Sequence, residues 1–262
     1  MRRERVGAGV AWAYIALVLL FLYVPLVPPL AFSLVPASGG DGGLTLRWYR
    51  ELWDNPLLAD GIQNSLLIGG LVGVLTPALA LLAAMAVREL RLKRLIVLTV
   101  LMPLFIPGVS MGLATAFFFR QLGVTPSMWT ITAVHVLWAL PFAFLVILAV
   151  MATFDPVYLE AAYLHGAGRW RAFVDVELPL IRHGILGAGI FSVILSFNET
   201  IRTALVQGPL NTVQTYIWST FLQVGLSPTL YALMSLLIIL TLGLVAALLA
   251  VGARGAVSPR GG

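Results

Sequence analysis

Two residues of opposite charge, Glu199 and Arg202, stand three positions apart at the end of a long apolar segment. An ionisable side chain within a membrane-spanning segment is costly to bury and usually serves a function. Glu199 could therefore contact a cationic solute, with Asn198 as a polar neighbour. Residues three apart also share one face of a helix, so Glu199 and Arg202 could instead neutralise each other. The spacing leaves both interpretations open.

Few other residues could support catalysis or hold a metal. The chain has no cysteine, and no two of its three histidines, His135, His165 and His183, have the spacing of metal ligands. No serine, histidine and acid set and no carboxylate pair is expected at one membrane depth. The phosphate-binding pattern G-x-x-x-x-G-K-[ST] does not occur. We therefore expect no catalytic residue, no metal site and no cofactor on this chain.

The composition indicates a membrane protein. Of 262 residues, 60% are hydrophobic and 10% are charged, against about 25% charged in soluble domains, and the mean hydropathy is +0.98. A helix needs about 20 apolar residues to cross a lipid bilayer. Six intervals meet or nearly meet this length, namely residues 10–34, 62–87, 95–119, 129–151, 184–205 and 229–251. The sequence predicts an all-α protein with six transmembrane helices.

Basic residues indicate which side of the membrane the connections face. Twelve of the 16 fall in alternate connections, and cytoplasmic loops are enriched in lysine and arginine. These twelve are Arg2, Arg3, Arg5, Arg88, Arg91, Lys93, Arg94, Arg169, Arg171, Arg182, Arg254 and Arg260. We expect both termini in the cytoplasm, with tails over residues 1–9 and 252–262 and the membrane domain over residues 10–251. The charges are too few for the dense basic stripe that nucleic-acid binding needs.

Several of the expected spans contain proline, as at Pro77, Pro107 and Pro141. Membrane helices tolerate proline because neighbouring groups satisfy the freed backbone. Broken helices that line a transport pathway also contain it. The sequence does not choose between these two explanations.

The long inner connection, residues 152–183, has the pattern of two short helices. Asp155 followed by Pro156 is a typical helix start. Gly166 and Gly168 interrupt the helical pattern and predict a turn, after which a second helix is limited by Pro179. A projecting element of this kind is suited to a groove on a partner protein.

The same connection carries the residues of a known motif. They are Glu160, Ala161, Ala162, Gly166, Ala167, Phe173, Val176, Leu178, Pro179, Gly184 and Ile185. This pattern resembles the EAA loop of inner-membrane permeases of binding-protein-dependent ABC importers. Shorter motifs, including Trp48-Tyr49 and Gly208-Pro209, resemble the second permease subunit of spermidine/putrescine-type systems. The chain departs from the family at His165, where an acid is usual, and at His183, where proline is usual.

The resemblance implies a type I ABC importer permease fold in a bacterial inner membrane. It implies that a cytoplasmic ABC ATPase dimer, which binds ATP and magnesium, docks on the loop. The docking residues carried over are Glu160, Ala161, Ala162, Gly166, Ala167, Arg169, Arg171, Leu178 and Pro179. It also implies an extracytoplasmic substrate-binding protein and a second homologous permease subunit, or a second copy of this chain. The implied cargo is polyamine-like, with an opine, an amino-acid-like compound, a sugar or an anion as alternatives.

Two other classes were weighed against this one. An autonomous secondary transporter needs ion-coupling residues, and the spans offer only His135 and the Glu199/Arg202 pair. A membrane enzyme needs a catalytic set that the sequence does not contain. Both leave the pattern of residues 152–183 unexplained.

Overall fold

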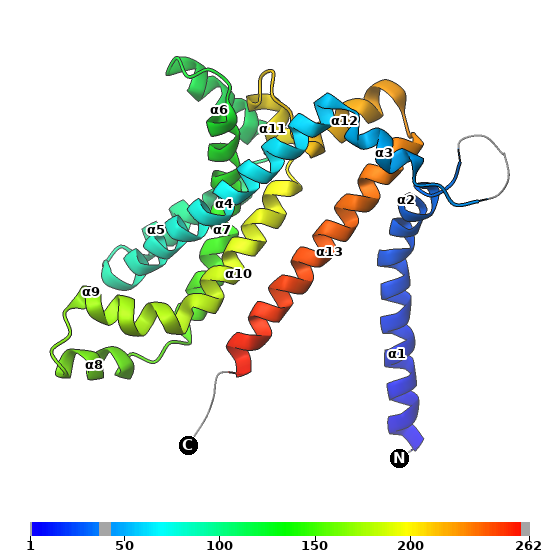
Figure 1. The fold of residues 1–262 in the computed structure, drawn as a ribbon. Helices are drawn as coiled ribbons and strands as arrows, with labels where there is room; N and C mark the ends of the chain where they lie inside the picture. Colours follow the sequence, from blue (N-terminus) through cyan, green and yellow to red (C-terminus); the bar gives the residue numbers. More distant parts are fainter. Residues whose placement is uncertain (1, 37–42, 258–262) are drawn as a thin grey trace. The chain divides into compact units, whose positions relative to one another are not determined.

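A computed structural model describes residues 2–36 and 43–257, and the side chains of residues 11–36 and 43–251. These described parts are built from helices and contain no strand, which confirms the all-α prediction (Figure 1). The chain divides into two compact units, Met1–Pro56 with Ser219–Leu242, and Leu57–Trp218 with Gly243–Gly262.

The first unit joins the N-terminal segment to the start of the last helix. Its elements are α1 (Arg2–Tyr23), the 3-10 turn η1 (Val24–Leu26), α2 (Val27–Phe32), α3 (Arg47–Trp53) and the beginning of α13 (Pro228–Val257). The Trp48 indole donates a hydrogen bond of 2.8 Å to the carbonyl of Val35. The Tyr49 hydroxyl lies 2.8 Å from the hydroxyls of both Ser33 and Ser235. These bonds hold α3 between the end of α2 and α13.

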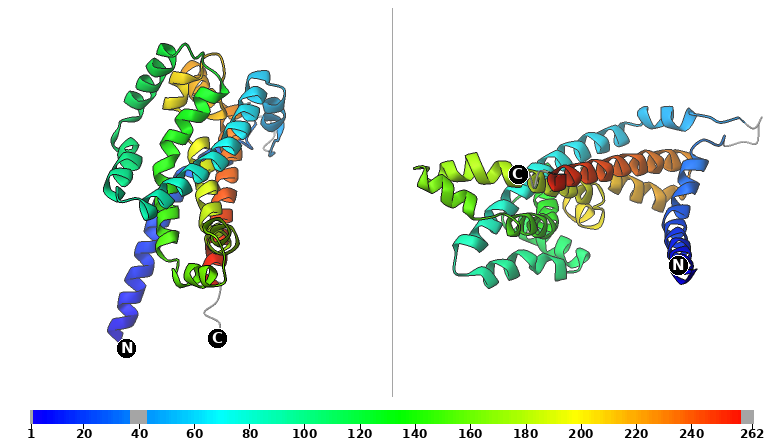
Figure 2. Two further views of the ribbon diagram at one scale, coloured as in Figure 1. Left: turned by 90° about the vertical axis from the view of Figure 1, so that its left-hand side faces the viewer. Right: turned by 90° about the horizontal axis from the view of Figure 1, so that it is seen from below.

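The second unit contains most of the expected membrane domain. Its elements are α4 (Pro56–Glu89), α5 (Lys93–Leu101), η2 (Met102–Phe105), α6 (Gly108–Gln121), α7 (Met128–Ala152), α8 (Val157–Leu164), α9 (Arg169–Ala172), the π-helical turn η3 (Phe173–Glu177), α10 (Leu178–Phe197), α11 (Ile201–Val206), the first half of α12 (Val213–Val224) and the end of α13. Helix α7 packs along α10, and α6 packs against α11 (Figure 2). Two buried apolar clusters, one around Ile131 and Val134 and one around Phe144 and Ile147, form the core.

Helices α4 and α10 approach each other through glycines. A Cβ atom on Gly189 of α10 would lie 2.8 Å from the carbonyl oxygen of Gly73 on α4. A Cβ on Gly73 would lie 2.6 Å from a methyl group of Val193. Small residues at such crossings let two membrane helices come close enough for backbone contact.

Five helical segments in the described ranges are long and apolar enough to cross a membrane. They are Ala11–Phe32, Pro56–Glu89, Met128–Ala152, Arg169–Phe197 and Pro228–Val251. A sixth is present if Lys93–Phe105 and Gly108–Gln121 count as one span, but these two helices meet at 107°. The span expected over residues 95–119 is therefore not one continuous helix, and its place as a single span stays a prediction. Pro107 explains the break, because it holds Ile106 in an extended conformation (φ −91°, ψ 124°) and has no N–H to donate.

The inner connection also differs from its prediction. We expected Pro179 to end the second short helix, but α9, η3 and α10 follow one another directly from Arg169 to Phe197. The wide π-helical turn over Phe173–Glu177 comes immediately before α10, and Pro179 stands in the first turn of α10. Proline is tolerated in a first turn because its missing N–H has no partner there. Helix α10 therefore begins inside residues 152–183 and ends before residue 205.

At the chain ends, the expected tails are only partly described. Residues 2–9 belong to helix α1, so the first helix begins before residue 10. Residues 258–262, with Arg260, lie outside the described part, as do the side chains of Arg2, Arg3, Arg5 and Arg254. The boundaries of both tails stay predictions.

Candidate functional site

The turn between α8 and α9 is a regular helix-ending motif. The Gly166 N–H donates to the carbonyl of Tyr163, and the Ala167 N–H donates to the carbonyl of Ala162, each at 3.0 Å. These two bonds form a Schellman motif, which requires a left-handed residue after the helix. Gly166 has φ +84°, a conformation that other residues adopt only with strain. The His165 ring donates from Nδ1 to the carbonyl of Ala161 at 2.8 Å.

The surface of this helix–turn–helix is exposed and largely apolar. Leu164 and Trp170 are 88% and 74% exposed, and Tyr158 is also exposed. No atom of the structure lies within 4 Å of a Cβ placed on Gly166 or Gly168. Glu160, Ala161, Arg169 and Arg171 are exposed, whereas Ala162 and Ala167 are half-buried. Tyr158 and Trp170 each contact one aromatic ring of the same unit, Phe154 and Phe173, and otherwise remain open to the surroundings.

A buried ion pair fixes the base of this region. The Glu177 carboxylate, in η3, is 1% exposed and accepts a hydrogen bond from the Arg88 guanidinium at the end of α4. Arg88 is 36% exposed and also donates from Nε to Glu89 at 3.0 Å. A cavity of about 810 Å³ lies beside the pair, walled also by Tyr163 and Arg169. The pair connects α4 to the start of α10, near the proposed motif residues Leu178 and Pro179.

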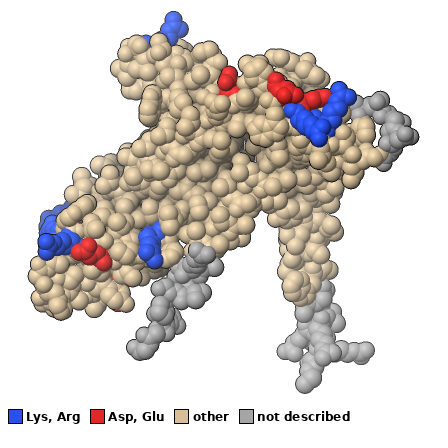
Figure 3. Space-filling view, viewed as in Figure 1, with Lys and Arg blue, Asp and Glu red and all other residues tan. Residues whose placement is uncertain are grey.

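Charged residues are unevenly distributed over the second unit. On the face drawn in Figure 3, the middle of the second unit is largely free of charged atoms, basic and acidic atoms gather toward the end that carries α8 and α9, and basic atoms mark the end of α6. A charge-free band between two charged ends is typical of a membrane-embedded domain.

Glu199, in the turn between α10 and α11, pairs with Arg202 in the first turn of α11. Their side chains are 7% and 9% exposed, and Arg202 Nη1 lies 2.5 Å from Glu199 Oε2. The other carboxylate oxygen accepts the backbone N–H of Arg202 at 3.0 Å, as an N-cap side chain does. The guanidinium also lies 3.9 Å from the centre of the Trp138 ring, within cation–π range. In this conformation the two charges neutralise each other.

Asn198 lies beside the pair but does not join it. Its amide donates to the carbonyl of Ile194 at 2.8 Å, and the residue is exposed. The bond satisfies a carbonyl at the end of α10.

His135 links the same turn to α7, which the sequence patterns did not predict. Its ring nitrogens lie 2.8 Å from the Ser196 hydroxyl and 2.7 Å from the Thr203 hydroxyl. The Thr203 hydroxyl donates to the carbonyl of Glu199 at 2.9 Å, so it accepts from His135 Nε2–H. In the neutral ring, Nδ1 then accepts from Ser196. His135 therefore bridges three helices, and a single histidine in an apolar span was the only sequence signal for this contact.

Helix α6 packs on this cluster through two glycines four residues apart. A Cβ on Gly108 would lie 3.2 Å from Arg202 Cζ, and a Cβ on Gly112 would lie 2.6 Å from a methyl group of Leu205. The G-x-x-x-G spacing, visible in the sequence, is the usual signature of closely packed membrane helices.

Metal-binding side chains do not cluster in the described ranges: no three of His, Cys, Asp or Glu are close enough to hold an ion. The expectation that this chain carries no cofactor stays a prediction.

The chain belongs to the family described as binding-protein-dependent transport system inner membrane component, whose pattern matches residues 76–254. It is accordingly a permease subunit of an ABC importer, a multi-span component of the inner-membrane type.

Relatives and solved structures agree with this family. The chain is 24% identical over 246 residues to the spermidine/putrescine transport system permease protein PotC of Escherichia coli, covering 92% of this chain and 93% of PotC. It is 24% identical over 240 residues to the putrescine transport system permease protein PotI of Escherichia coli, covering 87% and 85%. A permease chain in the crystal structure of a bacterial alginate ABC transporter, in complex with an alginate-bound periplasmic protein, shares the fold. The TM-score is 0.71 at 19% identity, over 95% of this chain and 93% of that one.

Proposed function

We propose that residues 152–183 dock on a cytoplasmic ABC ATPase dimer and couple its ATP cycle to alternating access in the membrane. The observation that carries this proposal is the exposed apolar surface of α8 and α9, two helices that the Gly166 turn connects. An apolar helical surface is the kind of element that fits a groove on a partner. The ATPase dimer binds ATP and magnesium, and this chain binds neither.

The Arg88–Glu177 pair supports a mechanical role for the same region. Because Glu177 is buried and paired with the last turn of α4, a displacement of η3 pulls on α4 directly. Helix α10 continues from η3 without a break. A docked ATPase that moves α8 and α9 therefore moves two long helices together.

The proposed membrane arrangement has six spans, with the bent pair α5 and α6 counted as one. Both termini and residues 152–183 lie in the cytoplasm, since twelve of the 16 basic residues fall on that side. One bundle of six helices is too small to enclose a pathway with two gates. A second homologous permease subunit, or a second copy of this chain, supplies the other half, and an extracytoplasmic binding protein delivers the solute.

The proposed cargo is polyamine-like. PotC and PotI are named for transport of spermidine and putrescine, and both match most of this chain. Glu199 is the candidate contact, with Asn198 and Arg202 beside it, and a cationic cargo that reached this carboxylate would have to displace the Arg202 guanidinium. The fold does not decide the cargo, because the alginate transporter shares it.

An opine, amino-acid-like compound, sugar or anion carried by the same machinery is the second candidate. Titration of the cognate binding protein with spermidine, putrescine, an amino acid and a sugar separates these possibilities. Failure to bind either polyamine removes the cargo proposal and leaves the docking proposal intact.

Replacing Gly166 with leucine tests the docking proposal. A leucine at φ +84° costs about 1–2 kcal/mol of strain and opens the Schellman turn. We expect normal membrane insertion, loss of transport and reduced co-purification of the ATPase subunit.

Gly225→Leu is the matched control. Gly225 has φ +80° and no atom within 4 Å of its Cβ position, as Gly166 does, but it lies in the turn before α13. The control carries similar strain and should retain the ATPase subunit. Equal retention of the ATPase by both variants, with coupled ATP hydrolysis preserved, would show that the Gly166 turn is not the docking site.

A further inference from the structure

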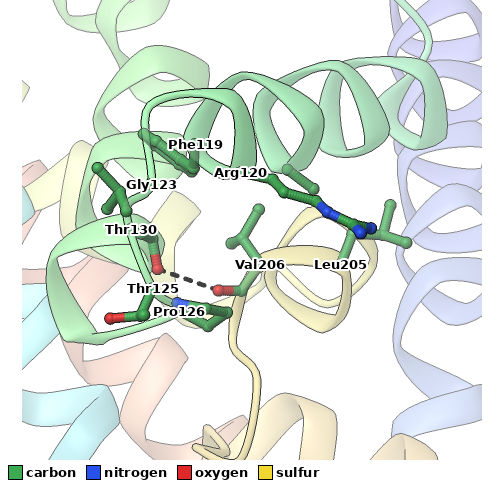
Figure 4. A pocket seen from close by; sticks show the side chains of 10 residues that line it. Phe119, Arg120, Gly123, Thr125, Pro126, Thr130, Leu205 and Val206 are labelled. Carbon is green, nitrogen blue, oxygen red and sulfur yellow. Dashed lines mark hydrogen bonds between the residues drawn. The ribbon is translucent and has the colours of Figure 1, made fainter.

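A hollow of about 380 Å³ opens between the end of α6, the following turn, the start of α7 and α11 (Figure 4). Its wall is mostly apolar, formed by Phe119, Val124, Pro126, Leu205 and Val206 among others. The volume falls within the range of about 300–1,000 Å³ that is usual for small-molecule sites. All of its lining residues belong to the second unit.

One charged side chain in the wall, Arg120, is exposed and has no protein partner in the described ranges. The single O–H of Thr130 is shared between the carbonyls of Ser127 and Val206, whose oxygens lie 2.7 and 3.0 Å from Oγ1, so this donor is already used; Figure 4 draws the contact with Val206. Arg120, at the last turn of α6, also lines the hollow. Its guanidinium has no hydrogen bond or ion pair with any residue of the described ranges. The hollow therefore combines an apolar interior with one unpaired positive charge.

The surface next to the hollow is apolar as well. Leu113, Phe117, Phe118 and Leu122, on α6 and just after it, are all exposed, with Phe117 62% exposed. In a membrane-embedded chain, such a helix face lies against lipid, and an arginine at its end reaches toward the headgroup region. An occupant that matches the apolar hollow, the apolar helix face beside it and the unpaired arginine needs an apolar chain and an anionic head.

We propose that this hollow binds an anionic phospholipid, with an acyl chain between α6, α7 and α11 and the phosphate paired with Arg120. A guanidinium binds a phosphate through two parallel hydrogen bonds, and basic side chains beside membrane helices attract anionic headgroups. The proposal needs only that the chain lies in a membrane, as its family membership establishes. It is independent of the cargo and of the docking loop.

Native mass spectrometry of the complete transporter tests the proposal. The transporter is reconstituted in nanodiscs that contain equal amounts of phosphatidylglycerol and phosphatidylethanolamine, and the lipid retained after release is identified. We expect selective retention of phosphatidylglycerol. Arg120→Gln should weaken this retention by roughly tenfold or more, because it removes a charge-assisted hydrogen-bonding group.

Two further variants separate this site from general surface charge. Arg50→Gln removes another exposed arginine, on α3, and should leave retention unchanged. Ala116→Phe keeps Arg120 but fills the hollow, and should lower retention. Equal retention of the two lipids overturns the proposal, as does an equal loss in Arg50→Gln. Absence of any retained lipid, with a partner-subunit side chain cross-linking into the hollow, overturns it as well.

Discussion

The crossing of α4 and α10 predicts a specific loss of stability on adding one methyl group. In Gly189→Ala the new Cβ would lie 2.8 Å from the backbone carbonyl oxygen of Gly73, about 0.6 Å short of ordinary contact. The backbone of Gly73 cannot rotate aside as a side chain does, so α4 and α10 must move apart. Overpacking of this kind costs about 1–3 kcal/mol, partly offset by the better helix propensity of alanine, about 0.5–1 kcal/mol.

Gly70→Ala is the matched control for this change. Gly70 also lies inside α4, and no atom lies within 4 Å of its Cβ position. It gains the same helix propensity without the clash, so the difference between the two variants measures the clash alone. For a chain of this size, about 1–3 kcal/mol corresponds to roughly 2–10 °C in thermal midpoint, measured on the purified transporter in detergent.

A third variant identifies the atom responsible. Gly73→Ala meets a methyl group of Val193 at 2.6 Å, and Gly73→Ala with Val193→Ala should recover most of the lost stability. Gly189→Ala meets backbone and has no such rescue. A thermal midpoint for Gly189→Ala equal to or above that of Gly70→Ala would refute the close crossing.

Two buried ion pairs give the remaining predictions. Arg88→Gln should lower stability more than Glu177→Gln, because it leaves the buried Glu177 carboxylate unpaired, which costs about 3–5 kcal/mol. In Glu177→Gln, by contrast, Arg88 still has Glu89 and water as partners. The reverse order of thermal midpoints would contradict the burial of Glu177. Glu199→Gln should impair both stability and uptake, because it strands the buried Arg202 charge. The double variant Glu199→Gln with Arg202→Gln decides between the two roles of the carboxylate: restored uptake means that it only pairs with Arg202, and lost uptake in a stable protein means that it contacts cargo.

Local features of the chain were predictable from its sequence, and contacts between distant residues were not. The length of a charge-free interval is a local property, so five of the apolar intervals correspond to long helices. Glu199 and Arg202 could be paired in advance because three residues separate them. Arg88 and Glu177 are 89 positions apart, and no spacing rule connects them.

Glycine contacts were predictable in part from the sequence. The G-x-x-x-G spacing of Gly69 with Gly73, and of Gly108 with Gly112, is visible in the sequence. The spacing indicates a helix that can be approached closely, but it does not name the partner. In the structure, the partner helix is α10 for Gly69 and Gly73, and α11 for Gly108 and Gly112.

The prolines differ in a way that the sequence did not reveal. Pro77 and Pro141 lie inside continuous helices, where neighbouring groups compensate for the lost N–H. Pro107 breaks its span, and the break places Gly108 at the start of α6, where a Cβ would lie 3.2 Å from the Arg202 guanidinium. Because so little room separates Gly108 from Arg202, we predict that a tilt of α6 toward α11 displaces that guanidinium from its carboxylate and its indole ring. Such a coupled movement would suit a bent helix beside a transport pathway.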